Sequence, residues 1–228
     1  MSGSRRRVAI LLDVDGTLIV SGGAGARSWK LAFDELYGIP ADIGEFTDTG
    51  MTDPEVGRKT FEAVLGRKPS VEEFTKLLER RQHYLYDTVE GSKQYRVLPG
   101  VKELLPRLLS EGYLLGLVTG NLEAAAHIKL HRARLNRFFS FGGYGSDSPD
   151  RSEVTRVALR RGAVVYGAEL EPAQAIVVGD TPHDVESAHA AGVECIGVAS
   201  HEFDADQLRA AGADYVIESL VEGLPGLR

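Results

Sequence analysis

Five short apolar runs, spread over the length of the chain, constrain its fold more than any other feature. Valine and isoleucine are frequent in these runs, and none of them alternates cleanly with polar residues. Such runs favour strands of a parallel sheet that is covered on both faces. Segments of helical pattern lie between them, and this alternation predicts a doubly wound α/β domain. The predicted strands are Val8–Leu12, Leu114–Val118, Ala175–Val178, Cys195–Ala199 and Tyr215–Ile217.

The aromatic residues at Phe138–Phe141 predict one further strand, and this prediction rests on composition alone. The helical patterns of the same domain show apolar residues at intervals of three and four. The helices that they predict are Val101–Glu111, Leu122–Arg134, Ser152–Arg161 and Val185–Ala191.

One long segment interrupts the alternation, because helical patterns follow one another there without a convincing strand. Asp53-Pro54 fits an N-cap followed by proline, and Ser70 fits the cap of the next helix. A block inserted after the first strand lies above the carboxyl ends of the strands, where open α/β sheets bind ligands. We therefore expect residues 21–96 to form a small helical cap domain, and residues 1–20 and 97–228 to form the core. The predicted cap helices are Ala24–Tyr37, Asp53–Leu65 and Val71–Val89.

Charge and composition exclude several classes of partner. The formal net charge of the 228 residues is -7, and no block of like charge occurs, so neither nucleic acid nor an anionic membrane is expected to bind. No apolar stretch approaches the roughly 18 residues of a membrane span, and Val8–Leu12 is too short for a signal peptide. The single cysteine, Cys195, cannot form an internal disulfide. We expect a cytoplasmic protein that is a monomer or a homodimer.

The first candidate for chemistry is Asp13-Val14-Asp15-Gly16-Thr17, directly after the first predicted strand. If the strand continued regularly, the two carboxylates would point to the same side. Buried like charges are unfavourable unless a cation or a proton compensates them. A single aspartate in a turn is commonplace, but two of them followed by Gly and Thr at the ligand-binding edge indicate a functional site.

The second candidate is Thr119-Gly120-Asn121, which ends another apolar run. A threonine hydroxyl and backbone N–H groups at the start of a helix can bind phosphate oxygens. Taken alone, these three residues are better explained as an ordinary turn with a helix cap.

The third candidate is the pair Asp180 and Asp184, which follow the strand predicted at Ala175–Val178. An acidic residue near a helix start is favoured by the helix dipole, so Asp184 alone carries little weight. With the first pair, however, up to four carboxylates gather at one edge of the sheet. Such an oxygen-rich cluster suits Mg²⁺, and it suits zinc poorly because no cysteine or histidine pair is spaced for it.

These three motifs, in this order, resemble the haloacid dehalogenase-like hydrolase superfamily, and in particular its phosphoglycolate phosphatase-like branch. The resemblance rests on Asp-Val-Asp-Gly-Thr at 13–17, Val-Thr-Gly-Asn at 118–121 and Gly-Asp-Thr-Pro-x-Asp at 179–184. It covers nearly the whole chain and includes a small helical cap inserted soon after the first motif. It implies a Mg²⁺-dependent phosphatase that acts on a small phosphorylated metabolite.

The chain departs from the family pattern at one position. The family normally carries a lysine, often in Lys-Pro, before the helix that precedes the last motif, and Ser148-Pro149 stands there in this chain. Arg151 is the nearest cation, and we expect it to hold the phosphoryl oxygens, because arginine can grip phosphate with two donors. Lys129 is the alternative, although it could equally lie on a solvated helix face.

The resemblance also implies a mechanism. Asp13 would attack phosphorus and form an aspartyl-phosphate, and at its ordinary pKa near 3.9 it would be ionised at neutral pH. Asp15 would donate a proton to the leaving oxygen and later accept one from water, and we expect anionic neighbours to keep it protonated part of the time.

The remaining roles are implied in the same way. Asp13, the backbone carbonyl of Asp15 and Asp180 would hold Mg²⁺, and Asp184 would support the ion. Thr119, Gly120, Asn121 and Arg151 would bind and stabilise the phosphoryl group. In related caps the substrate is contacted by the segment that corresponds to residues 49–53, so the expected contacts here are Gly50, Met51 and Thr52.

Four other functions share part of this pattern of residues. A haloacid dehalogenase would need neither a proton donor at Asp15 nor a metal cluster that includes Asp180. A phosphonate hydrolase needs a cap lysine where this chain has Asp53. A phosphosugar mutase keeps all the same core acids, so the core residues do not exclude this function. A non-catalytic phospholigand-binding protein is favoured only by the missing Lys-Pro.

Overall fold

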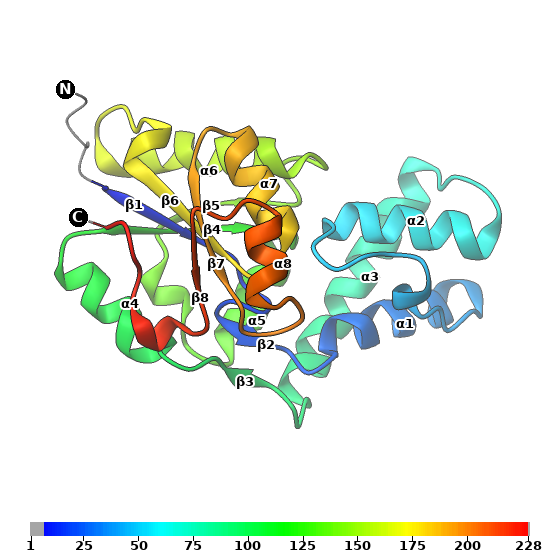
Figure 1. Ribbon diagram of the computed structural model, residues 1–228. Coiled ribbons are helices and arrows are strands. Elements are labelled where there is room, and N and C mark those ends of the chain that lie inside the picture. Colours follow the sequence, from blue (N-terminus) through cyan, green and yellow to red (C-terminus); the bar gives the residue numbers. More distant parts are fainter. Residues whose placement is uncertain (1–6, 228) are drawn as a thin grey trace.

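The strand that precedes the first pair of aspartates lies in the middle of a six-stranded parallel sheet (Figure 1). In the computed structural model, which describes residues 7–227, β1 (Ala9–Leu12) pairs with β4 (Leu114–Thr119) on one side and with β6 (Ala175–Gly179) on the other. The strand order is β5-β4-β1-β6-β7-β8, and every neighbouring pair is parallel. The other strands are β5 (Phe141–Tyr144), β7 (Glu194–Val198) and β8 (Tyr215–Ile217).

Both faces of the sheet are covered by helices, which explains why the strands do not alternate between apolar and polar residues. Ile10 and Leu12 pack in one apolar layer with α4 and α5, whereas Ala9 and Leu11 pack in a second layer with α6 and α7. The predicted doubly wound α/β fold is therefore confirmed. The helices of the core are α4 (Val101–Ser110), α5 (Glu123–His131), α6 (Arg151–Tyr166), α7 (Pro182–Ala190) and α8 (Ala205–Ala210).

The strand predicted at Phe138–Phe141 is displaced in the structure. Residues Asn136–Phe138 form a short 3-10 helix, and the strand begins only at Phe141 and includes Gly142 and Gly143. Glycine has no side chain to pack in a strand and weakens the apolar pattern, so the sequence placed the strand too early. Three further 3-10 helices are Ile43–Glu45, Pro172–Gln174 and Leu220–Glu222.

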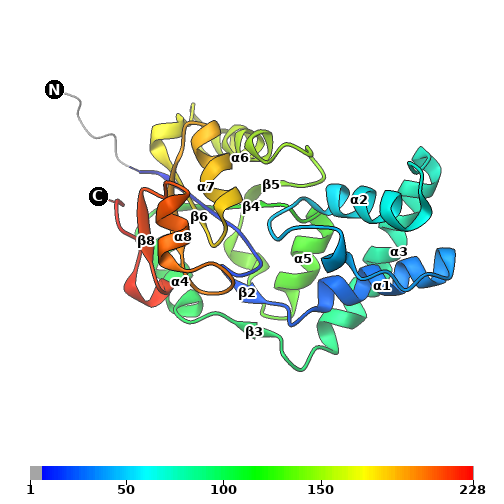
Figure 2. The same cartoon turned by 45° about the vertical axis from the view of Figure 1, so that its right-hand side comes forward.

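The inserted segment forms a separate helical lobe beside the carboxyl ends of the strands (Figures 1 and 2). The chain leaves the core through β2 (Ile19–Val20) and returns through β3 (Arg96–Val97), and these two short strands pair antiparallel. The lobe has its own apolar core, which includes Trp29, Phe33 and Phe61. Its helices are α1 (Ala24–Tyr37), α2 (Asp53–Leu65) and α3 (Val71–Glu90).

The helix caps of the lobe agree only in part with the sequence. Ser70 caps α3 and forms a reciprocal capping box with Glu73. The predicted N-cap Asp53 is instead the first residue of α2, and Thr52 caps this helix by accepting a hydrogen bond from the Glu55 N–H. The carboxylate of Asp53 is engaged elsewhere, as described below. None of the helices in residues 7–227 is both long and apolar enough to cross a membrane.

Candidate active site

A small cavity lies where the loops after β1, β4 and β6 meet the helical lobe. Its volume is about 140 Å³, well below the roughly 300 Å³ at which pockets for drug-sized ligands begin, so it suits a small metabolite. Residues from all three sequence motifs line it, together with residues 49–51 and 53 of the lobe. The lining is Asp13, Asp15, Thr49, Gly50, Met51, Asp53, Thr119, Gly120, Asn121, Lys129, Arg151 and Thr181.

Three buried carboxylates gather at the carboxyl end of the central strands. Oxygen atoms of Asp13, Asp180 and Asp184 all lie within 4.8 Å of one another. Burial and the charge of Asp184 raise the pKa of Asp13 to about 8, although Arg151 acts in the opposite direction. Burial and the charges of Asp13 and Asp184 raise the pKa of Asp180 to about 9. The expectation that Asp13 is ionised at its ordinary pKa is therefore wrong unless a cation joins the cluster.

The glycine of the first motif is required by this cluster. Gly16 has a φ of +80°, and a Cβ atom there would lie 2.0 Å from an oxygen of Asp180. Thr17, the next residue, donates a hydrogen bond of 3.1 Å from its hydroxyl to Asp180. The tight turn after β1 therefore brings backbone against the carboxylate and holds Asp180 in place.

The donor set of this cluster fits a hard divalent cation. Three carboxylates offer oxygen ligands, which Mg²⁺ prefers, and the raised pKa values of Asp13 and Asp180 show that the cluster needs a cation or protons to be stable. Asp184 serves two purposes: one oxygen accepts hydrogen bonds from the Thr181 N–H and hydroxyl, while the other pairs with Arg151. The helix-cap interpretation and the functional interpretation of Asp184 are thus compatible.

Mg²⁺ should stabilise the fold, and more strongly at pH 8 than at pH 5.5. In the metal-free folded protein the pKa values of Asp13 and Asp180 are raised above their ordinary values. The unfolded chain therefore releases these protons at a lower pH than the folded protein does. As a result, the free energy of unfolding falls as the pH rises toward 8 to 9. Mg²⁺ at 100 times its Kd would contribute about 2.7 kcal/mol, or a Tm increase of about 5–10 °C at pH 8. At pH 5.5 protons compete for the same oxygens, and the increase should be smaller.

Thermal melts in EDTA and in MgCl₂ at both pH values would measure this difference. Asp180→Asn is the matched variant, because it removes one carboxylate of the cluster and should weaken both the effect of Mg²⁺ and the pH dependence. Equal Tm values with and without Mg²⁺ at pH 8 would contradict a metal site here.

Asp15 does not belong to the cluster of Asp13, Asp180 and Asp184. Its Oδ2 atom accepts hydrogen bonds from Lys129 Nζ at 2.5 Å and from Asn121 Nδ2 at 2.9 Å. Burial acts to raise the pKa of Asp15, but the charge and hydrogen bond of Lys129, with the bond from Asn121, outweigh it and lower the pKa. The expectation that anionic neighbours keep Asp15 protonated is wrong, because Lys129 and Asn121 stabilise its carboxylate form.

Lys129 is buried, with 5% of its surface exposed, and does not lie on a solvated helix face. Besides Asp15, it donates to the side-chain oxygen of Asn121 at 2.6 Å. Asn121 in turn donates to the hydroxyl oxygen of Thr119 at 2.8 Å. The second motif and Lys129 therefore form one network around Asp15.

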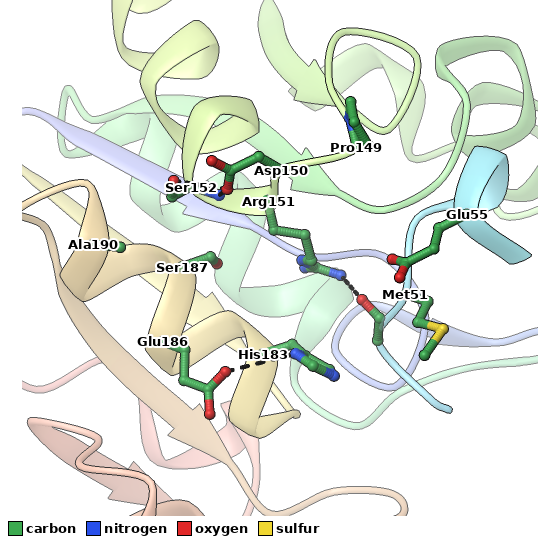
Figure 3. A pocket seen from close by; sticks show the side chains of 11 residues that line it. Met51, Glu55, Pro149, Asp150, Arg151, Ser152, His183, Glu186, Ser187 and Ala190 are labelled. Atoms are coloured by element: carbon green, nitrogen blue, oxygen red, sulfur yellow. Dashed lines mark hydrogen bonds and ion pairs between the residues drawn. The ribbon is translucent and has the colours of Figure 1, made fainter. Parts of the chain in front are cut away.

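Arg151 is the cation beside Asp13 and Asp184. It is the first residue of α6 and lies 4.0 Å from a carboxylate oxygen of Asp13, while the same nitrogen pairs with Asp184. Its second terminal nitrogen donates a hydrogen bond of 2.7 Å to the carbonyl of Gly50 in the lobe (Figure 3). Lys129 and Arg151 thus contact different aspartates: Lys129 pairs with Asp15, whereas Arg151 lies beside Asp13 and Asp184.

Residues 49–53 hold the lobe against the core. The Asp53 N–H donates to the Gly120 carbonyl at 2.7 Å, and the Leu122 N–H donates to the Asp53 carboxylate at 2.8 Å. Gly50 has a φ of +94° and packs so closely on His183 that a Cβ atom would lie 2.7 Å from its ring. Gly50 and Met51 line the cavity, whereas Thr52 is fully buried and does not line it.

A larger cleft of about 350 Å³ lies beside the cavity and shares Gly50, Met51 and Arg151 with it (Figure 3). His183 and Glu186 of α7 form another part of its wall. None of the paired aspartates of the first motif lines this cleft, so we place the chemistry in the smaller cavity.

Sequence reasoning missed two features of the site. The ion pair of Arg81 with Asp53, at 2.9 Å, joins residues of two different cap helices. The hydrogen bond from the Leu122 N–H, in the loop after β4, to the Asp53 carboxylate joins residues 69 positions apart. Neither pair has a local spacing signal, although Asp53 lies within residues 49–53, the segment expected to contact the substrate.

Comparisons with known proteins agree with this geometry. Residues 10–198 match the family described as haloacid dehalogenase-like hydrolase. The pyrophosphatase PpaX of Bacillus velezensis is 29% identical over 221 residues, covering 95% of this chain and 94% of that protein. A phosphoglycolate phosphatase of Aquifex aeolicus is 30% identical over 194 residues, 81% of each chain.

Solved structures show the same fold. A hydrolase from Pseudomonas syringae superposes with a TM-score of 0.72 at 24% identity, and the match covers 94% of this chain and 95% of that one. CbbY from Rhodobacter sphaeroides, in complex with phosphate, superposes with a TM-score of 0.70 at 19% identity, with coverage of 94% and 95%.

Proposed function

Because the chain belongs to the haloacid dehalogenase-like hydrolase family, we propose that it is a Mg²⁺-dependent phosphatase that hydrolyses a small phosphomonoester through an aspartyl-phosphate on Asp13. The observation that carries the proposal is the environment of Asp13. This carboxylate lies on the wall of a small cavity, beside two further carboxylates that suit a cation and beside the guanidinium of Arg151. The names of the relatives, a pyrophosphatase and a phosphoglycolate phosphatase, support phosphoryl transfer.

The proposed reaction has two steps. In the first, a carboxylate oxygen of Asp13 attacks phosphorus, the bond from phosphorus to the leaving oxygen breaks, and Asp15 gives that oxygen a proton. In the second, water attacks the phosphorus of the aspartyl-phosphate, Asp15 accepts a proton from the water, and the bond from phosphorus to the Asp13 oxygen breaks, so that phosphate leaves and the carboxylate is regenerated. Because Lys129 favours the ionised form of Asp15, the first step requires that Asp15 be protonated when substrate is bound.

The other residues bind and orient the phosphoryl group. Under the proposal, Thr119, Gly120 and Asn121 lie along its oxygens, and Arg151 balances its charge. Asp13, Asp180 and the backbone carbonyl of Asp15 would hold Mg²⁺, with Asp184 beside them, and the ion would offset the repulsion between nucleophile and phosphate. The lobe residues Gly50 and Met51 would contact the leaving group from the opposite wall.

The proposal is tested by phosphate release from a panel of small phosphomonoesters and pyrophosphate, with MgCl₂ and with EDTA. We expect release that depends on Mg²⁺ and is fastest for a compound small enough for the cavity. Sugar phosphates in the panel distinguish a mutase, which would return the phosphoryl group to the sugar and form an isomer. Absence of phosphate release from every compound, with folded protein and Mg²⁺ present, would refute a phosphatase.

A further inference from the structure

Arg81 of α3 is a buried cation with unused hydrogen-bond donors. Its exposed fraction is 1%, and one of its terminal nitrogens pairs with Asp53 at 2.9 Å. Its Nε and Nη1 atoms have no hydrogen-bond partner within the part of the chain that the structure describes. The guanidinium also lies 5.2 Å from the centre of the Trp29 ring. Buried polar groups are nearly always hydrogen-bonded, so two unpaired donors on a buried charge need an explanation.

Packing alone does not explain this arginine. A buried ion pair is seldom more stable than apolar residues of similar size, because taking two charges out of water is unfavourable. Apart from Asp53, the guanidinium of Arg81 contacts Trp29, which belongs to the apolar core of the lobe. The two unpaired donors of Arg81 are therefore energetically unfavourable, and a ligand that accepts hydrogen bonds from them could offset this disadvantage.

The position of Arg81 connects it to the proposed reaction. Its partner Asp53 lines the cavity that contains Asp13 and Asp15. The lobe also approaches Lys129, since a Cβ atom on Gly25 of α1 would lie 3.8 Å from Lys129 Nζ. The phosphoryl side of the cavity, at Asp13, has Arg151 as its cation. Arg81 thus belongs to the lobe side, where the leaving group would lie.

We propose that Arg81 binds an anionic group on the leaving portion of the substrate, a carboxylate or a second phosphate. This inference rests on the proposed function and narrows its substrate class to phosphorylated compounds with a second negative charge. A guanidinium has only donors, and charged acceptors make its strongest hydrogen bonds. The anionic group would accept hydrogen bonds from the donors that are now unpaired, while the bond to Asp53 is kept.

The test measures binding and not turnover, so that it does not depend on hydrolysis. Asp13→Asn would be titrated calorimetrically in MgCl₂ with three ligands: phosphoglycolate, the amide of phosphoglycolate, and pyrophosphate. The amide keeps the phosphate but lacks the carboxylate charge. The same titrations would be made on Asp13→Asn/Arg81→Met. We expect Asp13→Asn to prefer an anionic ligand over the amide, and Arg81→Met to weaken only the anionic ligands, by about 10- to 100-fold. Loss for phosphoglycolate alone would identify a carboxylate, and loss for pyrophosphate alone a second phosphate.

Two further variants separate recognition from folding. Arg81→Lys keeps the charge and should retain part of the preference for anionic ligands over the amide. Arg80→Met changes the neighbouring, partly exposed arginine and should leave this preference unchanged. If Arg81→Met bound the anionic ligands and the amide more weakly by the same factor, the inference would be overturned. It would also be overturned if Asp13→Asn bound the anionic ligands no more tightly than the amide. Hydrolysis by the native protein of phosphomonoesters whose leaving portion is uncharged would still support the phosphatase, so the two proposals fail separately.

Discussion

Replacing Asp13 by asparagine should reduce phosphate release by about 10⁴-fold or more. The amide has nearly the same shape as the carboxylate but cannot form the aspartyl-phosphate, and loss of a nucleophile typically removes nearly all of the chemical rate enhancement. Steady-state release from the best substrate of the panel would measure the loss. The remaining residues of the cavity, including Thr119 and Arg151, should still bind substrate.

The stability of the same variant provides its control. Asp13 is buried among like charges, and burial and Asp184 raise its pKa to about 8. Asp13→Asn should therefore be at least as stable as the native protein in EDTA at pH 8, since one buried charge is removed. An inactive but stable variant supports a catalytic role. A variant that loses both stability and activity would indicate that Asp13 is needed for the fold.

Replacing Arg151 by methionine should lower kcat by about 10²- to 10³-fold, the usual effect of losing one donor that stabilises transition-state charge. The change leaves Asp184 without its ion-pair partner and Gly50 without its hydrogen bond. Arg151→Lys should be intermediate, because an ammonium can keep the charge beside Asp184 but lacks the planar fork that reaches both partners. Rate measurements with the same substrate on the three proteins test this order.

Lys129→Met is the matched comparison for the Arg151 variants, because it also removes a buried cation from the cavity. Lys129 donates a hydrogen bond to Asp15, whereas Arg151 is the cation beside Asp13. Loss of Lys129 should therefore lower the rate most for substrates with poor leaving groups. If Arg151→Met kept a native kcat while Lys129→Met lost activity toward every substrate, Lys129 would be the phosphoryl-binding cation, and our assignment of Arg151 would be wrong.

Much of the fold follows from local sequence patterns. Buried strands such as Ala175–Gly179 are continuous apolar runs, and helices such as Ala24–Tyr37 have the expected periodicity and glycine at both ends. The resemblance to the haloacid dehalogenase-like family, stated from three motifs, is confirmed by the match over residues 10–198. The strand at Phe141–Tyr144 could not be placed correctly, because two of its four residues are glycine.

The electrostatics of the site could not be predicted from the motifs. Asp13 and Asp15 are two residues apart, yet their pKa values are shifted in opposite directions. The pKa values differ because Asp13 lies in a cluster with Asp180, whereas Asp15 binds Lys129, which is 114 residues further along the chain than Asp15. Contacts of this kind depend on how helices pack on the sheet, and no local spacing reports them.

Chemical trapping of the phosphorylated enzyme tests the central claim most directly. Enzyme mixed with its best substrate would be quenched in acid, reduced with borohydride, which converts an aspartyl-phosphate to homoserine, and digested with trypsin. Cleavage after Arg7 and Arg27 yields one peptide that contains both Asp13 and Asp15, so fragmentation can distinguish them. We predict homoserine at position 13 only when substrate is present. Homoserine at position 15 or at another residue, or an unmodified Asp13 during confirmed turnover, would contradict Asp13 as the nucleophile.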